Sequence, residues 1–127
     1  MAENNKTVLI VDDESDVRDF ISTILKDNGY TTISAVDGVD ALEKVKASPP
    51  DLITLDVSMP EKSGVKFYRE MKESDQWKTI PIVIVTGVTD EFKRFISTRR
   101  QVPPPEGYLS KPFDENEVLG LVKKLTA

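Results

Sequence analysis

The sequence predicts a doubly wound α/β fold, in which a parallel sheet of five strands carries helices on both faces. Predicted strands, the clearest of them continuous apolar runs, alternate five times with segments of helical periodicity over the 127 residues, which is the pattern of repeated strand–helix units. Such uninterrupted runs are typical of strands that are buried on both faces of a parallel sheet. Right-handed crossovers between parallel strands then place helices on both sides.

The first two units have clear start and stop signals. The apolar run 8–11 predicts a strand, and the helical spacing of the apolar residues that follow predicts a helix over 15–28. Gly29 comes next, at a place where a left-handed residue commonly ends a helix. The second unit has a weaker strand over 31–35 and a helix over 39–47, which a pair of prolines ends.

The later units repeat this order, with one irregular segment. Expected in turn are a strand over 52–55, a helix from about 64 to 74, a strand over 82–85, a helix through Phe92 and Ile96, a strand at 108–109 and a helix over 114–125. The segment 97–107 contains Arg99, Arg100 and the consecutive prolines Pro103 to Pro105, which do not fit the interior of a helix. We expect a loop there, and the sequence does not define its role.

Length and composition exclude several kinds of protein. A chain of 127 residues fits one compact domain, so we expect a single domain over 1–127 with a flexible N-terminal segment at 1–5. The net charge of −5 opposes binding to DNA. The absence of cysteine and histidine excludes disulfides, thiolate metal sites and imidazole bases. No apolar run is long enough for a membrane span, which predicts a cytoplasmic protein.

The residues that follow the predicted strands form the candidate site. In an open α/β sheet, ligands bind outside the carboxyl ends of the strands. The residues at these ends are Asp12, Asp13, Asp56, Thr86 and Lys111. Three carboxylates that converge on one crevice repel one another unless a cation lies among them. Because the ligand atoms are all oxygens, the sequence favours Mg²⁺, for which Mn²⁺ could substitute.

Each of these residues also has a purely structural interpretation. Asp12 and Asp13 could cap the following helix. Asp56 could be a turn residue, Thr86 a β-branched strand end and Lys111 an exposed charge. In the functional interpretation, the Asp56 carboxylate is a nucleophile toward phosphorus and forms an acyl phosphate. Thr86 and Lys111 then supply a hydroxyl donor and a cation for the phosphoryl oxygens.

Four motifs together resemble the receiver domains of response regulators in bacterial two-component systems, over nearly the whole chain. The motifs are Val-Asp-Asp-Glu at 11–14, Leu-Asp-Val-Ser-Met-Pro at 55–60 with Gly64 after it, Val-Thr-Gly at 85–87 and Tyr-Leu-Ser-Lys-Pro-Phe at 108–113. The resemblance implies a flavodoxin-like fold with strand order 2-1-3-4-5. It also implies a signalling domain, not an enzyme in the ordinary sense, that catalyses its own phosphorylation and dephosphorylation.

The resemblance assigns roles around the phosphoacceptor. Asp56 would accept the phosphoryl group. Mg²⁺ would bind directly to Asp13, through water to Asp12, and to the backbone carbonyl of Ser58. Transfer would rest on an in-line approach of Asp56 and on neutralisation of the phosphoryl charge, without a general base.

It also assigns the residues that would sense the phosphoryl group. Thr86 would form a hydrogen bond with it and Lys111 an ion pair. Tyr108 occupies the aromatic position that turns inward on activation, although it could equally be an ordinary half-buried strand residue. The face of the fourth helix, fifth strand and fifth helix would change as a result. Ser58 and Val88 occupy two positions that tune the phosphoryl lifetime, and neither is an acid or amide, which predicts slow self-dephosphorylation.

We therefore expect a stand-alone receiver domain that acts through proteins. Its phosphoryl donor would be a histidine kinase or a histidine phosphotransfer protein, and its signal would pass to a downstream protein target. We expect a monomer or a weak phosphorylation-dependent dimer. A phosphorylation-independent interaction module on the same scaffold stays open as the alternative. A haloacid-dehalogenase-like phosphatase is disfavoured, because Ser58 stands where that family needs a second acid.

Overall fold

A computed structural model of the protein describes residues 6–56, 63–86, 105–110 and 113–126, with only the backbone at Ser63 and Thr86. Three of the expectations above lie outside the described residues. They are the flexible segment 1–5, the helix through Phe92 and Ile96, and the loop over 97–107 as far as residue 104.

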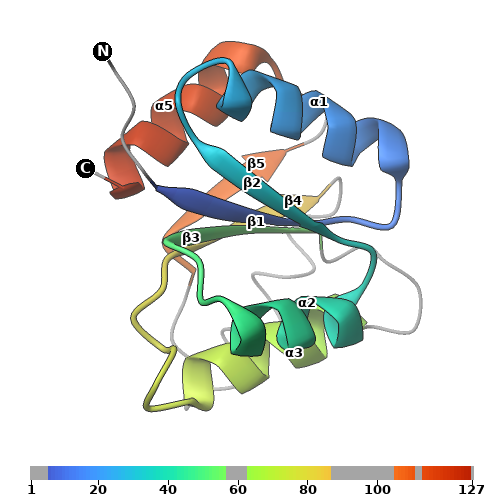
Figure 1. Ribbon diagram of the computed structural model, residues 1–127, viewed down its shortest axis with the longest axis vertical. Coiled ribbons are helices and arrows are strands. Elements are labelled where there is room, and N and C mark those ends of the chain that lie inside the picture. Colours follow the sequence, from blue (N-terminus) through green and yellow to red (C-terminus); the bar gives the residue numbers. More distant parts are fainter. Residues whose placement is uncertain (1–5, 57–62, 87–104, 111–112, 127) are drawn as a thin grey trace.

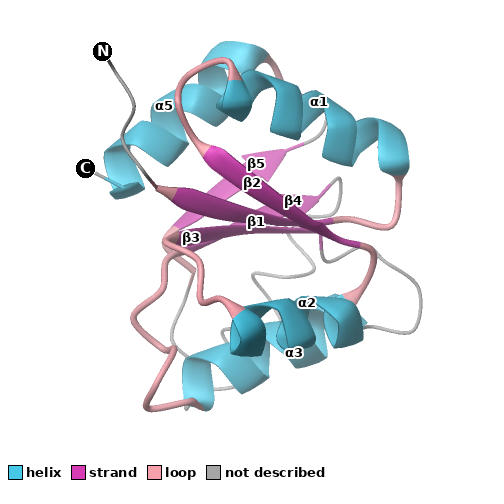
Figure 2. Cartoon of the chain, in the orientation of Figure 1, coloured by secondary structure: helices cyan, strands magenta, loops and turns pink. Residues whose placement is uncertain are grey.

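Five parallel strands form one sheet in the order β2-β1-β3-β4-β5 (Figure 2). The strands are β1 (Thr7–Val11), β2 (Thr31–Ala35), β3 (Leu52–Asp56), β4 (Ile82–Thr86) and β5 (Gly107–Ser110). The central strand β3 is buried at every position, as a strand covered on both faces must be. β2 lies at the edge of the sheet and is only partly buried, which explains its weaker apolar pattern. The expected strand order is confirmed.

Helices cover both faces of the sheet, which confirms the doubly wound arrangement. The described helices are α1 (Ser15–Lys26), α2 (Gly38–Ala47), α3 (Ser63–Glu73) and α5 (Glu115–Thr126). Figure 1 shows α1 and α5 together on one face and α2 and α3 together on the other. The molecule therefore has three layers, with the carboxyl ends of all strands on the same edge.

The end of α1 differs from the expected boundary. The helix stops at Lys26 and not at 28, because the backbone turns sharply over the next residues. The Asn28 side chain donates a hydrogen bond from Nδ2 to the Ile24 carbonyl at 2.9 Å. Gly29 has φ 91°, the left-handed conformation that favours glycine. The amide of Tyr30 then donates to the Leu25 carbonyl at 3.0 Å and closes the helix.

The core consists of two apolar clusters, one on each face of the sheet. Along β1, Leu9 and Val11 belong to the cluster under α2 and α3, while Val8 and Ile10 belong to the cluster under α1 and α5. This division follows from the alternation of side chains along a strand. β1, β3 and β4 contribute side chains to both clusters, so each pair of helices packs against the same central strands.

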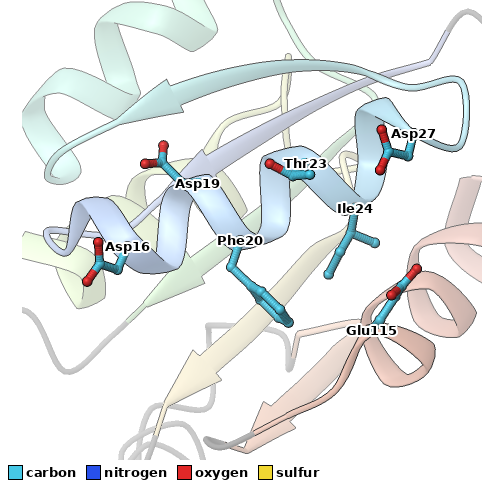
Figure 3. Close-up of a pocket in the computed structure, with 7 residues that line it drawn as sticks. All are labelled: Asp16, Asp19, Phe20, Thr23, Ile24, Asp27 and Glu115. Carbon is cyan, nitrogen blue, oxygen red and sulfur yellow. The ribbon is translucent and has the colours of Figure 1, made fainter.

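An open groove of about 550 Å³ lies between α1 and α5 (Figure 3). Its lining residues are Asp16, Asp19, Phe20, Thr23, Ile24, Asp27 and Glu115. Phe20 is 45% exposed, and its ring packs at a tilt against Phe113 with centroids 6.1 Å apart. The groove thus combines an exposed aromatic ring with four carboxylates around it.

The buried phenol of Tyr68 makes the fold sensitive to alkaline pH. Tyr68 lies on α3 and is fully buried, and this burial raises the pKa of its hydroxyl, with further contributions from Glu106 and Tyr108. The unfolded chain loses the phenolic proton above its ordinary pKa of 10.0, whereas the folded chain keeps it. The contribution of Tyr68 to the unfolding free energy is therefore fully present below pH 10. It decreases as the pH rises further, by up to about 1.4 kcal/mol per pH unit.

Replacing Tyr68 with phenylalanine tests this dependence. We expect the difference in unfolding free energy between Tyr68→Phe and the unchanged chain to be constant from pH 7 to 9. Above pH 10 the unchanged chain should lose stability more steeply, because its phenol must stay protonated. Urea unfolding at each pH gives both curves. If the two curves of unfolding free energy against pH stayed parallel above pH 10, the prediction would be wrong.

Candidate functional site

The carboxyl edge of the sheet brings three of the predicted site residues together, namely Asp12, Asp13 and Asp56. β1 and β3 are neighbours, with Val11 opposite Leu55, so the residues that come next, Asp12 and Asp56, lie side by side. Asp56 in turn is opposite Val85 on β4. The parallel register therefore places the two acidic strand ends next to each other, as the sequence predicts.

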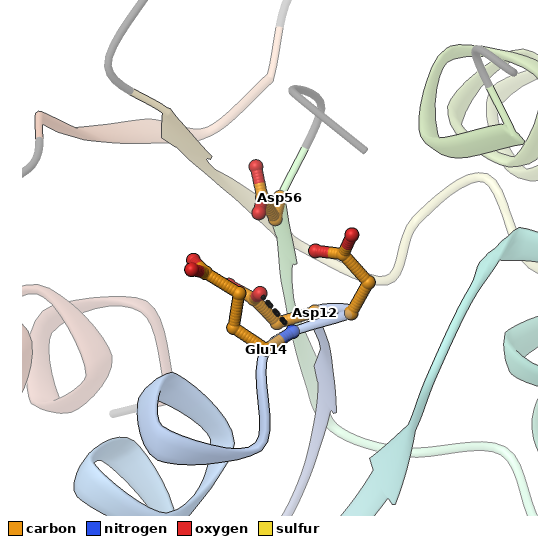
Figure 4. Close-up of side chains that lie close together, drawn as sticks. Asp12, Glu14 and Asp56 are labelled. Carbon is orange, nitrogen blue, oxygen red and sulfur yellow. Dashed lines mark hydrogen bonds between the residues drawn. The ribbon is translucent and has the colours of Figure 1, made fainter. Parts of the chain in front are cut away.

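Four carboxylates meet at this edge, which we call the acidic cluster: Asp12, Asp13, Glu14 and Asp56. One carboxylate oxygen from each lies within 4.8 Å of the others. Asp12 and Asp56 are each only 2% exposed, whereas Asp13 and Glu14 are exposed. Figure 4 shows the side chains of Asp12, Glu14 and Asp56 converging from β1, the following turn and β3. The cluster has a buried floor and a side that is open to solvent.

Backbone contacts hold Asp12 in place. Its Oδ1 accepts a hydrogen bond from the amide of Glu14 at 2.9 Å (Figure 4). Its own amide donates to the Ala35 carbonyl at 3.1 Å, and its carbonyl accepts from Nη1 of Arg18 at 2.7 Å. The side chain is therefore fixed by the turn between β1 and α1, with Oδ1 engaged in that turn.

Neither Asp12 nor Asp13 is the N-cap residue of α1. The N-cap residue of α1 is Glu14, and its side chain makes no capping hydrogen bond. By contrast, α2 has a conventional cap, in which Oδ1 of Asp37 accepts from the amide of Asp40 at 2.8 Å. Oδ1 of Asp12 nevertheless accepts from the amide of the N-cap residue Glu14, so Asp12 both contributes to the acidic cluster and binds the start of α1.

The chemistry of the acidic cluster fits a hard divalent cation. Its ligand atoms are carboxylate oxygens, which Mg²⁺ and Mn²⁺ prefer. Carboxylates this close repel one another in a buried setting, and a cation among them removes the repulsion. The exposed side at Asp13 and Glu14 leaves room for the waters that Mg²⁺ usually retains. Asp12, Asp13, Glu14 and Asp56 are the residues that could hold it.

Thr86 is described by its backbone, and two other expected site residues lie outside the described residues. Thr86 is the last residue of β4 and stands opposite Ser110 of β5, which puts its backbone on the same edge as Asp56. Ser58 and Lys111 lie outside the described residues. Glu14 is a member of the cluster that the sequence pattern did not mark, although its position directly after Asp12 and Asp13 was the available signal.

Tyr108 is half-buried on β5, opposite Ile84. It packs against the apolar cluster under α2 and α3, and burial raises the pKa of its hydroxyl. This environment suits an ordinary strand tyrosine and equally a ring with two positions, so both interpretations stay open. In the part of the chain that the structure describes, no helix is long and apolar enough to cross a membrane.

Related sequences identify the family. A profile of the response regulator receiver domain matches residues 8–123. Protein PilG of Pseudomonas aeruginosa is 30% identical over 116 residues, which cover 91% of this chain and 84% of that protein. The alkaline phosphatase synthesis transcriptional regulatory protein PhoP of Bacillus subtilis is 33% identical over 121 residues, covering 95% of this chain. The chain spans about half of PhoP, namely 48% of its length.

Solved structures agree with the sequence relatives. The chemotaxis response regulator CheY4 of Vibrio cholerae matches with a TM-score of 0.83 and 31% identity, over 96% of this chain and 99% of that one. The receiver domain of NtrX from Brucella abortus matches with a TM-score of 0.79 and 27% identity, over 94% and 97% of the two chains. By the matching profile, the curated relatives and the shared fold, this chain belongs to the response regulator receiver domain family.

Proposed function

We propose that this receiver domain accepts a phosphoryl group onto Asp56 in an Mg²⁺-dependent reaction and thereby alters a protein-binding face. The observation that carries the proposal is the placement of Asp56. It lies at the carboxyl end of β3, is 2% exposed, and is within 4.8 Å of three further carboxylates. Receiver domains interact with histidine kinases and downstream effectors, so the donor proposed here is a histidine kinase or a histidine phosphotransfer protein.

The proposed reaction is a displacement at phosphorus. An Asp56 carboxylate oxygen forms a new P–O bond while the P–N bond to the donor histidine breaks, and the electron pair leaves with the imidazole, which takes a proton from solvent. The bound Mg²⁺ would supply charge neutralisation for the phosphoryl oxygens. Asp12, Asp13 and Asp56, with the carbonyl of Ser58, would hold this cation, and Glu14 is close enough to contribute.

The remaining site residues have proposed roles after transfer. Thr86 would donate a hydrogen bond to the phosphoryl group and Lys111 would form an ion pair with it, because Thr86 ends β4 and Lys111 comes directly after β5 in the sequence. Movement of Thr86 would let the Tyr108 ring turn inward and change the surface around β5 and α5. Because Ser58 and Val88, which the family resemblance links to the phosphoryl lifetime, are neither acids nor amides, we expect slow hydrolysis of the acyl phosphate.

Small phosphodonors test the proposal without knowledge of the kinase. The protein is incubated with acetyl phosphate or phosphoramidate, with Mg²⁺ or with excess EDTA, and its intact mass is measured. We expect a gain of one phosphoryl group that requires Mg²⁺. If the protein binds Mg²⁺ but gains no mass with either donor, the alternative of a phosphorylation-independent interaction module would replace the proposal.

Divalent-cation binding should depend on Asp13. We expect Asp13→Asn to weaken Mg²⁺ and Mn²⁺ binding by at least about tenfold, because a charged oxygen ligand is replaced by a neutral amide. Titration calorimetry with Mg²⁺ and the paramagnetic relaxation of water by Mn²⁺ measure the affinity. Asp75→Asn is the matched control, since the Asp75 side chain is 99% exposed and away from the acidic cluster. Equal losses in the two variants would rule out a specific site.

The groove between α1 and α5 is the surface we propose for docking of the donor. It begins one turn after the acidic cluster, because α1 follows Glu14 directly. It is lined by the exposed ring of Phe20 and by four acidic residues, Asp16, Asp19, Asp27 and Glu115. This combination favours a helical segment that carries both apolar and basic side chains. The charge pattern, and not the apolar ring alone, would then select among kinases.

Phosphotransfer profiling tests the docking surface. A panel of purified histidine kinases is first used to find the one that phosphorylates the unchanged chain fastest. We expect Phe20→Ala to slow transfer from that kinase by about tenfold or more, because an exposed aromatic anchor is lost. Labelling by acetyl phosphate should be unaffected. Val39→Ala, which truncates a 69% exposed side chain on α2, is the control, and an equal effect of both variants would contradict the assignment.

A further inference from the structure

A buried ion pair lies at the edge of the sheet opposite the acidic cluster. Nζ of Lys72, near the end of α3, is 2.9 Å from both Oε1 and Oε2 of Glu106. The Lys72 side chain is only 2% exposed and that of Glu106 is 35% exposed. A lysine in a buried position is costly unless it is paired. An apolar side chain at position 72 would avoid this cost but could not pair with Glu106.

The same carboxylate also binds the backbone of β4. Oε1 of Glu106 accepts a hydrogen bond from the amide of Ile82 at 2.8 Å, and the Glu106 amide donates to the Ile82 carbonyl at 3.1 Å. Glu106 is thus joined to the first residue of β4 twice and to α3 once. It immediately precedes β5, so these bonds fix the point at which β5 begins.

The next residue, Gly107, is held from the other face of the sheet. A Cβ atom at Gly107 would lie 3.0 Å from a methyl carbon of Leu121 on α5, so the strand passes close to that helix. β5 has four residues and is hydrogen-bonded to β4 alone. Contacts at Glu106 and Gly107 therefore help to fix the start of this short edge strand, in addition to its ladder with β4 and the burial of Leu109 in the core.

Tyr108 comes two residues after Glu106 and shares its face of the sheet. The ring packs against the apolar cluster that contains Tyr68, and Tyr68 is four residues before Lys72, on the same side of α3. Nζ of Lys72 lies 5.9 Å from the centre of the Tyr68 ring. Glu106 and Tyr108 both raise the pKa of Tyr68, which agrees with their closeness to its hydroxyl.

We propose that Lys72 and Glu106 are a positioning pair for Tyr108, which ties the start of β5 to α3 and β4 and thereby sets the resting position of the Tyr108 ring. Loss of the pair lets the first residues of β5 shift, and Tyr108 shifts with them. The pair thus shifts the equilibrium between two positions of the Tyr108 ring. A ligand that favours one of these positions should therefore bind with a different apparent affinity when the pair is removed. The inference deepens the proposed switch role of Tyr108 and rests on it.

Fluorine NMR on protein labelled with 3-fluorotyrosine tests the pair directly. The chain has three tyrosines, so three signals are assigned by single phenylalanine substitutions. Lys72→Met and Glu106→Gln each remove one charge, and the glutamine side chain keeps an oxygen for the Ile82 amide. We expect both variants to move and broaden the Tyr108 signal in the resting protein. Lys44→Met, which breaks the exposed Lys44–Asp40 pair on α2 at 3.2 Å, should leave it unchanged.

A titration with beryllofluoride and Mg²⁺ separates positioning from mere support of the fold. We expect the concentration that produces half of the Tyr108 change to differ by at least about threefold between each pair variant and the unchanged chain. Unaltered resting signals and unaltered midpoints in both folded variants would overturn the inference. Failure of the proposed function looks different, because beryllofluoride would then leave Tyr108 of the unchanged chain unmoved while the resting-state comparison still reports on the pair.

Discussion

Replacing Asp56 with asparagine is expected to abolish phosphorylation by acetyl phosphate, with the labelling rate falling by at least about a thousandfold. The amide of asparagine has nearly the same shape as the carboxylate but is not a nucleophile toward phosphorus. Because Asp56 is 2% exposed, keeping its shape matters, and this substitution preserves the packing at the end of β3. The effect would therefore be chemical and not a consequence of unfolding.

Intact mass and thermal unfolding together decide this prediction. The Asp56→Asn protein should gain no phosphoryl group under conditions that label the unchanged chain fully. Its unfolding temperature should be equal or higher, since one of four mutually repelling carboxylates has been neutralised. Asp75→Asn is again the matched control and should label normally. A phosphoryl group on the Asp56→Asn protein would mean that another side chain is the acceptor.

Truncating Glu106 to alanine is expected to cost about 3 kcal/mol of unfolding free energy. Lys72 would keep its buried charge without a partner, and breaking one side of a buried ion pair typically costs about 3–5 kcal/mol. The lower end applies because the Glu106 side chain is 35% exposed, so water replaces part of the lost interaction. The Ile82 amide also loses the acceptor that lies 2.8 Å away.

A double replacement distinguishes a lost charge pair from a lost packing contact. Lys72→Met combined with Glu106→Gln removes both charges, keeps comparable side-chain volume and leaves an oxygen to accept from the Ile82 amide. We expect its unfolding free energy to lie within about 1 kcal/mol of the unchanged chain, because no charge is left buried without a partner. Urea unfolding of the two single variants and the double variant completes the cycle. Additive losses in the double variant would contradict this account.

The architecture could be predicted from the sequence because the two main signals are strong. A continuous apolar run such as 8–11 has few interpretations other than a doubly covered strand, and the acids that follow it mark the carboxyl edge. The end of α1 was less certain, because Asn28 fits a helical pattern while Gly29 turns the backbone. Helix ends depend on a few hydrogen bonds that periodicity does not reveal.

The candidate site was predictable only where residues follow strands. Asp12 and Asp56 could be paired because parallel register places neighbouring strand ends together. The contribution of Glu14 depends on how the turn folds back, which the sequence pattern does not encode. Lys72 was missed for a different reason: lysine on a helix is ordinarily exposed, and its burial depends on Glu106, which lies 34 positions away. Roles for Ser58 and Lys111 stay predictions.

The exposed edge of β2 has a consequence for the behaviour of the protein at high concentration. An edge strand presents unpaired backbone groups that can recruit the edge of another chain and begin aggregation. β2 has only five residues, and its sequence is Thr-Thr-Ile-Ser-Ala, with hydroxyl side chains at three positions. A strand this short and polar is a poor template for cross-chain pairing. Pairing between copies of this protein through the β2 edge should therefore be weak even when the protein is crowded.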